Sequence, residues 1–93
     1  MLAGNRAAAA DQFIKFADTY KQSPMMASAL YNAGIARYEQ KDLAGAAVAF
    51  GRLVAEKPDS KEAVDGRFWL GVAQFELGKA AEAVATLARW PTA

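Results

Sequence analysis

The feature that most constrains the fold is an internal repeat with a period of 37 residues. Positions of matching size recur at this interval in one register. The recurring sets are Ala9, Ala46 and Ala83; Phe13, Phe50 and Leu87; Gly34 and Gly71; Tyr31 and Phe68; and Tyr38 and Phe75. Chance supplies one such set in an alanine-rich chain, but five sets in the same register indicate a chain built from repeated structural units.

Within each unit, apolar residues recur at intervals of three and four, which is typical of amphipathic helices. Local signals then predict where the helices begin and end. The predicted starts are Asn5, Ser23-Pro24, Asp42 and a capping box of Asp59 with Glu62; the predicted stops are near Gln22, near Gln40, before Pro58, at Gly78 and at Pro91, after Trp90. A tight turn at Lys41-Asp42 joins the second helix to the third.

Two kinds of helix alternate along the chain. We call A the helices with a mid-helix glycine, and B the helices with the Ala-x-x-x-Phe or Ala-x-x-x-Leu pair; the order is B-A-B-A-B. Since no A–B hairpin can bury its apolar face alone, the hairpins are predicted to stack. We therefore predict an all-α solenoid of about two and a half repeats in one domain, residues 1–93, divided into 5–22, 24–58 and 59–91. Because the chain starts inside a repeat, we expect it to be part of a longer protein.

The mid-helix glycine of each A helix requires an explanation, because glycine in a helix interior costs about 1 kcal/mol relative to alanine. We predict that a neighbouring helix packs closely over Gly34. A hinge or a ligand contact is the alternative interpretation.

Composition excludes several classes of function. The chain has no cysteine and no histidine, so disulfides, thiolate or imidazole zinc sites and Cys or His nucleophiles are ruled out. A net charge of +1 favours neither nucleic acid nor an anionic membrane, and no apolar run reaches the roughly 20 residues of a membrane span. The carboxylate pairs Asp59 with Glu62 and Glu39 with Glu76 have no partner nucleophile. We predict no enzymatic activity, no cofactor and no metal site.

The spacing of five residues resembles the tetratricopeptide repeat: Leu30, Gly34, Ala46, Phe50 and Pro58. The second hairpin repeats the pattern through Gly71, Ala83 and Leu87, but has Arg67 in place of the leading apolar residue. The period of 37 exceeds the family's usual 34. Together with the linkers YKQSP and KPDSK, it resembles bacterial envelope proteins such as the Tol-Pal-associated cell-division coordinator and outer-membrane assembly lipoproteins. This resemblance implies a periplasmic or envelope location.

The resemblance also implies a binding surface, because A helices line the concave face in this family. The expected partner-binding residues are Ser28, Tyr31, Asn32, Ile35, Glu39, Asp65, Phe68, Trp69, Val72 and Glu76. The competing interpretation is that Tyr31, Ile35, Phe68 and Val72 only fill the space between hairpins. Trp69 stands one repeat after Asn32, at a position that tolerates polar residues, so it is the preferred contact residue. We expect an apolar or mixed peptide, or a helix, of a protein partner rather than a carboxylate clamp.

A second hypothesis concerns the unpaired first helix. Its aromatic residues Phe13, Phe16 and Tyr20 have no A helix before them in the sequence to cover them. Exposed apolar patches of this kind mark interaction sites. The alternative function is therefore structural self-assembly, with a homodimer formed through this helix.

Overall fold

The computed structural model describes residues 3–88, and the side chains of residues 8–88. This part of the chain consists of five α-helices and contains no strand: α1 Ala3–Thr19, α2 Met26–Glu39, α3 Leu43–Glu56, α4 Lys61–Glu76 and α5 Ala80–Ala88. α2 and α4 are the A helices, and α1, α3 and α5 are the B helices. The predicted all-α class and the B-A-B-A-B order are confirmed.

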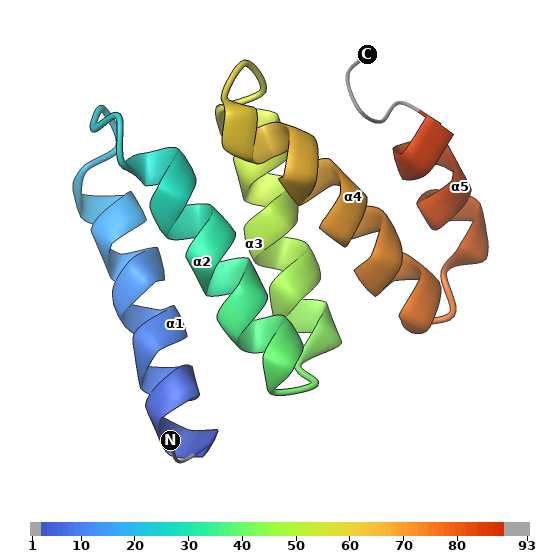
Figure 1. The fold of residues 1–93 in the computed structure, drawn as a ribbon, viewed down its shortest axis with the longest axis horizontal. Helices are drawn as coiled ribbons and strands as arrows, with labels where there is room; N and C mark the ends of the chain where they lie inside the picture. Colours follow the sequence, from blue (N-terminus) through green and yellow to red (C-terminus); the bar gives the residue numbers. More distant parts are fainter. Residues whose placement is uncertain (1–2, 89–93) are drawn as a thin grey trace.

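The helices stack in sequence order. Each helix packs against the next, and the two A helices α2 and α4 also pack directly against each other. Figure 1 shows the five helices side by side, from α1 at one edge to α5 at the other. Two ion pairs connect α1 to later helices: Arg52 Nη1 on α3 lies 2.8 Å from Asp18 Oδ1, and Arg37 Nη2 on α2 lies 3.7 Å from Asp11 Oδ1. Because α2 and α4 pack against each other, the A helices form one continuous surface across the repeats.

The core is built mainly from alanine, with few large side chains. The largest fully buried side chains are Phe50, Met26, Leu30 and Leu53. Small neighbours let the helix backbones approach one another, so each large residue fills the space beside several small ones. Phe50 and Leu53 both project from α3, which makes α3 the centre of the packing.

The glycines of the A helices pack against large residues of the B helices, as predicted. A Cβ atom on Gly34 would lie 2.5 Å from Cε1 of Phe50, and one on Gly71 would lie 2.5 Å from Cγ of Leu87. These two contacts are equivalent, one repeat apart. Close helix packing, rather than a hinge, explains both glycines.

Both A–B turns close in the same way. Lys41 has φ 68° and Gly78, one repeat later, has φ 82°. In the residues that directly follow these two, the Asp42 amide donates to the Arg37 carbonyl and the Lys79 amide donates to the Gln74 carbonyl, each at 2.9 Å. This is the hydrogen bond that closes a Schellman motif. The tight turn at Lys41-Asp42 and the helix end at Gly78 are confirmed.

The start of α3 is as predicted, but the starts of α2 and α4 are not. α2 begins at Met26, so the predicted start at Ser23-Pro24 is wrong by two residues: the Ser23 hydroxyl accepts from the Met25 amide at 3.1 Å within a turn that precedes the helix. The Asp42 side chain accepts from the Gly45 amide at 3.0 Å and caps α3. The cap of α4 is Ser60 rather than Asp59: Ser60 is extended (φ −76°, ψ 152°), and its Oγ accepts from the Ala63 amide at 3.1 Å. The predicted capping box of Asp59 with Glu62 is therefore wrong by one residue, because Pro58 and Asp59 form a turn that the Ser60 amide closes on the Lys57 carbonyl at 3.1 Å, which leaves Ser60 as the residue before the helix.

The ends of the first and last helices also differ from the prediction or lie outside what is described. α1 begins at Ala3 and ends at Thr19, so Asn5 lies inside the helix and is not its cap. The alanine run that follows explains this extension, since alanine has the highest helix propensity. Trp90 and Pro91 lie outside the described residues. Among the described helices, none is both long and apolar enough to cross a membrane.

Candidate functional site

The ten predicted partner-binding residues all lie on α2 and α4, the two A helices that pack together. We call this surface the A face. Five of its side chains are exposed, and five are partly buried. The exposed ones are Asn32, Glu39, Asp65, Phe68 and Glu76; the partly buried ones are Ser28, Tyr31, Ile35, Trp69 and Val72. Their role in binding remains a prediction.

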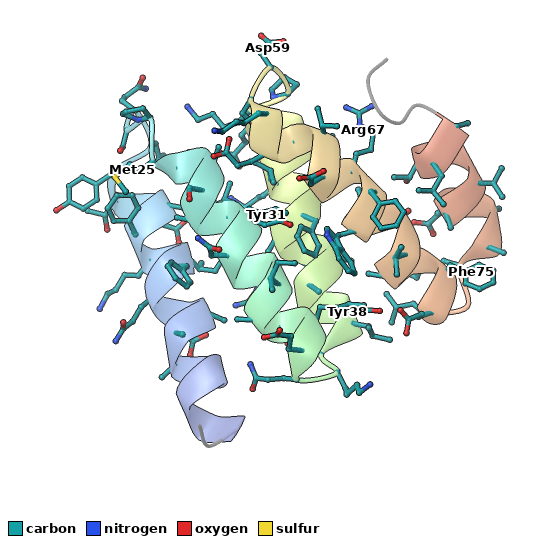
Figure 2. All side chains as sticks on the ribbon, in the orientation of Figure 1. Met25, Tyr31, Tyr38, Asp59, Arg67 and Phe75 are labelled. Atoms are coloured by element: carbon teal, nitrogen blue, oxygen red, sulfur yellow. The ribbon has the colours of Figure 1, made fainter. Side chains whose placement is uncertain are left out.

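Aromatic rings mark the junction of the two helices on the A face. The Trp69 ring lies 5.2 Å from that of Tyr38 and 5.5 Å from that of Phe68, centroid to centroid. Tyr38 extends from α2 toward α4 (Figure 2). Tilted and edge-on rings at these distances attract one another, so Trp69 is held in place by its neighbours. It nevertheless remains partly exposed.

Tyr38 belongs to this site although the prediction left it out. Its hydroxyl donates a hydrogen bond to Oε2 of Glu76, which links α2 to α4. This hydrogen bond, with a smaller effect of burial, raises the pKa of the Tyr38 phenol above its ordinary value of 10.0. A sequence signal for Tyr38 did exist: it lies seven residues after Tyr31, two helical turns along the same side of α2.

The charged members of the A face are all acidic: Glu39, Asp65 and Glu76. The arginine of α2 points elsewhere, because Arg37 Nη1 donates to the Gly45 carbonyl at 3.4 Å. The A face thus combines aromatic rings with carboxylates, whereas the chain as a whole carries a charge of only +1. Its charge is opposite in sign to that of the whole chain.

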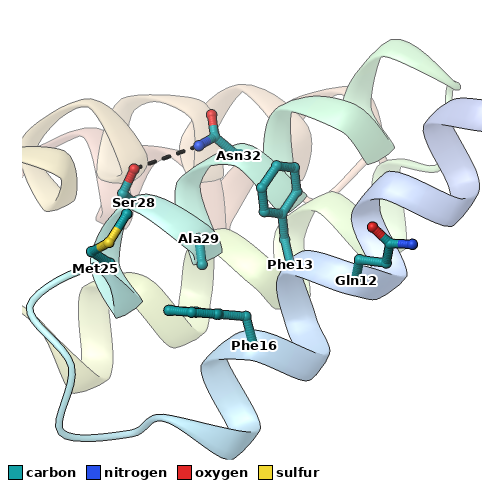
Figure 3. Close-up of a pocket in the computed structure, with 7 residues that line it drawn as sticks. All are labelled: Gln12, Phe13, Phe16, Met25, Ser28, Ala29 and Asn32. Atoms are coloured by element: carbon teal, nitrogen blue, oxygen red, sulfur yellow. Dashed lines mark hydrogen bonds between the residues drawn. The ribbon is translucent and has the colours of Figure 1, made fainter.

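A pocket of about 300 Å³ lies between α1 and α2, next to the A face. Figure 3 shows the rings of Phe13 and Phe16 on α1 opposite Ala29 of α2, with Asn32 donating to Ser28 above them. The lining residues are Gln12, Phe13, Phe16, Met25, Ser28, Ala29 and Asn32. The structure therefore brings together residues that were predicted for two different roles, partner binding (Ser28, Asn32) and self-association (Phe13, Phe16).

The third residue predicted for self-association, Tyr20, is not part of the pocket. Its side chain is 55% exposed, and its ring lies 4.9 Å from that of Phe16. Met25 and Gln12, which the prediction missed, complete the pocket wall. Met25 could have been found from the sequence, because it lies one helical turn before Ser28 and Ala29.

The described side chains form no group of three acidic, His or Cys residues that could hold a metal ion. Of the two carboxylate pairs considered from the sequence, Glu76 accepts the Tyr38 hydroxyl and Asp59 is an exposed loop residue. The arrangement offers apolar and aromatic surface with acidic groups around it, which is suited to contact with another molecule.

Antiparallel helix pairs that stack through glycine contacts and recur after 37 residues define an α-helical repeat protein, a solenoid. Comparison with known families identifies which one. Two tetratricopeptide-repeat family models match the chain, one over residues 3–61 and the other over residues 37–93. Each covers more than half of the 93 residues, and the chain belongs to the tetratricopeptide repeat family. No curated relative matches it. Repeats of this family generally mediate protein–protein interaction, and proteins that contain them are typically non-catalytic scaffolds.

Proposed function

We propose that the chain is a non-catalytic scaffold that binds a peptide or helix of a partner protein on the A face, the concave side of the solenoid. The observation that carries this proposal is the position of Trp69 at the junction of α2 and α4. There it packs between Tyr38 and Phe68 and remains partly exposed. Tryptophan is enriched among the residues that dominate binding energy, because it combines a large apolar area with one hydrogen-bond donor.

The rigidity of this site adds to the argument. Tyr38 is fixed by its hydrogen bond to Glu76, and Trp69 is fixed by the rings on both sides. A side chain that is already ordered loses little entropy on binding. A partner that docks across α2 and α4 therefore keeps most of the energy gained by covering Trp69.

The test compares two alanine variants, one at a partly exposed apolar residue and one at an exposed apolar residue. Trp69→Ala removes the proposed contact, and Val84→Ala on α5, where the side chain is 68% exposed, is the matched control. Proteins that co-purify with the tagged chain from its own cells are quantified for both variants. We expect at least one protein to be retained with Val84→Ala and lost with Trp69→Ala. Identical sets of proteins would refute the proposal.

Self-assembly through α1 is the second candidate. It is favoured by the exposure of Tyr20 and by the partly exposed rings of Phe13 and Phe16. Light scattering over a concentration series tests it. A dimer that dissociates in Phe13→Glu or Phe16→Glu would support this function, and a mass of one chain at every concentration would exclude it.

We also propose an envelope location for the parent protein, on the basis of the 37-residue period and the two linkers YKQSP and KPDSK. Fractionation of bacterial cells that express the tagged, full-length gene product tests this proposal. Recovery with cytoplasmic markers would contradict it.

A further inference from the structure

The aromatic rings of the A face meet at an angle and are not stacked on one another. Tyr38 and Phe68 contact Trp69 at interplanar angles of 58° and 77°. Trp69 remains partly exposed, and Phe68 is 38% exposed. Because the face of an aromatic ring carries the negative part of its quadrupole, it attracts cations, and tryptophan does so most strongly. The junction of α2 and α4 therefore favours a positively charged group.

The Asp65 carboxylate stands next to Trp69 on α4. Asp65 precedes Trp69 by four residues, and side chains four residues apart are neighbours on a helix surface. The equivalent pair one repeat earlier is close enough for a hydrogen bond, since Asn32 Nδ2 donates to Ser28 Oγ at 3.5 Å. Asp65 is exposed. A group that covers Trp69 therefore lies beside a negative charge on the same helix.

A second carboxylate, that of Glu76, lies on the other side of the rings. Its Oε2 atom accepts the Tyr38 hydroxyl, and the Tyr38 ring, which extends from α2 toward α4 in Figure 2, packs on Trp69. The donor is a neutral hydroxyl, so the hydrogen bond orients Glu76 without cancelling its charge, and the carboxylate can accept from further donors. Along α4, Trp69 thus lies between Asp65, one turn before it, and Glu76, two turns after it.

The basic residues of α2 and α4 lie away from Trp69. These helices carry three of them, Arg37, Lys61 and Arg67. Arg37 pairs with Asp11 of α1, and Arg67 lines a cavity with side chains of the B helices α3 and α5. Lys61, the first residue of α4, lies two turns or about 12 Å before Trp69. The surface around Trp69 is therefore negatively charged, and a positively charged partner complements it.

Of the two basic side chains that a partner can offer, arginine fits this surface better than lysine. The guanidinium group is planar, so it stacks on an aromatic ring such as that of Trp69, and its N–H groups donate to a neighbouring carboxylate at the same time. The lysine ammonium is a compact, strongly hydrated charge. An arginine with apolar residues beside it thus matches both the rings and the carboxylates of the A face.

We propose that the partner segment on the A face is basic, and that one of its arginines stacks on Trp69 and donates to the Asp65 carboxylate. This inference rests on the proposed function and adds to it the chemical class of the partner. An acidic segment is disfavoured, because Glu39, Asp65 and Glu76 repel it. Since the carboxylates are exposed, added salt weakens the attraction.

Selection from a random peptide library tests the chemistry of the partner before the partner is identified. The library displays peptides of about 16 residues, enough for about four helical turns, and is selected on the immobilised full chain. Peptides that bind Trp69→Ala equally well are discarded, which keeps those that contact the proposed site. We expect the retained peptides to contain arginine more often, and aspartate and glutamate less often, than the unselected library. Circular dichroism checks that Trp69→Ala keeps its helices.

Two charge-neutralising variants then test the contact at Asp65. Asp65→Asn removes the charge next to Trp69, and Glu82→Gln, at an exposed residue of α5, is the matched control with the same change in net charge. The affinity of the tightest retained peptide is measured by fluorescence anisotropy. We expect Asp65→Asn to weaken binding by about 2- to 5-fold, the range of an exposed ion pair, and Glu82→Gln to leave it unchanged. A peptide with citrulline, the neutral isostere, in place of arginine should bind the parent chain and Asp65→Asn equally.

Retained peptides without enrichment in arginine would overturn this inference and leave the proposed function intact. Equal effects of Asp65→Asn and Glu82→Gln would also overturn it, because the charge effect would then be general rather than local. So would a citrulline peptide that binds the parent chain as tightly as the arginine peptide. A selection that retains no peptide would overturn it as well, whereas the proposed function is decided by its own co-purification test.

Discussion

The contact between Gly34 and Phe50 allows a quantitative test of the packing, because the chain contains a second mid-helix glycine that lacks such a contact. Gly34→Ala and Gly51→Ala each gain about 1 kcal/mol of helix propensity. At Gly51 the new methyl group meets nothing within 4 Å, so that gain is retained. At Gly34 it would lie 2.5 Å from a fully buried ring, and such overpacking costs about 1–3 kcal/mol.

The two variants should therefore differ by about 2 kcal/mol in the free energy of unfolding, which corresponds to about 8–16 °C in Tm for a domain of this size. Gly51→Ala is expected to melt above the parent chain, and Gly34→Ala at or below it. Thermal unfolding followed by circular dichroism measures both values. Gly34→Leu, with a larger side chain, is expected to unfold the first full hairpin. Equal Tm increases for the two alanine variants would refute the close approach of α2 to α3.

Three further predictions follow from the caps, the turns and the Tyr38 hydrogen bond. Ser60→Ala should lower the free energy of unfolding by about 1 kcal/mol, whereas Asp59→Ala should change it by less than about 0.5 kcal/mol in urea titrations. Gly78→Ala should cost about 1 kcal/mol by the same measurement, since its positive φ penalises a Cβ atom and no new contact compensates. Because the folded-state pKa of Tyr38 lies above 10.0, its hydrogen bond to Glu76 stabilises the fold below that pH and is lost as the pH rises through the folded-state pKa. The urea midpoint should accordingly fall more between about pH 9 and pH 11 in the parent chain than in Tyr38→Phe.

The arrangement of the helices was predictable because contacts between repeats leave paired traces in the sequence. A glycine in the middle of a helix and a large residue 16 positions later, such as Gly34 with Phe50, recur as Gly71 with Leu87. Each pair marks one contact between an A helix and a B helix, in which a small residue faces a large one. The size of the residue at each of these positions is kept from one repeat to the next, even where the residue itself differs.

Helix starts were less predictable, because adjacent residues offered equivalent caps. Asp59 and Ser60 both have side-chain oxygens that can accept from a free amide, and the sequence favoured Asp59 through Glu62. The choice of Ser60 depends on the path of the chain after Pro58, which is a matter of three-dimensional geometry. Asn5 failed for another reason: the preference of neighbouring alanines for helix outweighed its capping tendency.

The sequence predicted which helices carry the candidate site, but not the full set of residues that come together in it. Exposure of Phe13 and Phe16 was expected from the unpaired helix, and the A face from the repeat register. That Phe13 and Asn32 would line one pocket depends on how α1 and α2 sit against each other, which periodicity within each helix does not determine. The role of Tyr38 likewise depends on its partners Trp69 and Glu76 in the neighbouring repeat.

The central claim, that a partner protein contacts the A face around Trp69, is tested most directly by site-specific photocrosslinking in living cells. A benzophenone amino acid replaces Trp69 in one variant and Val48, 62% exposed on the B helix α3, in the other. We predict a discrete crosslinked species after irradiation for position 69 and none for position 48. No adduct at position 69, or the same adducts at equal yield from both positions, would contradict the claim.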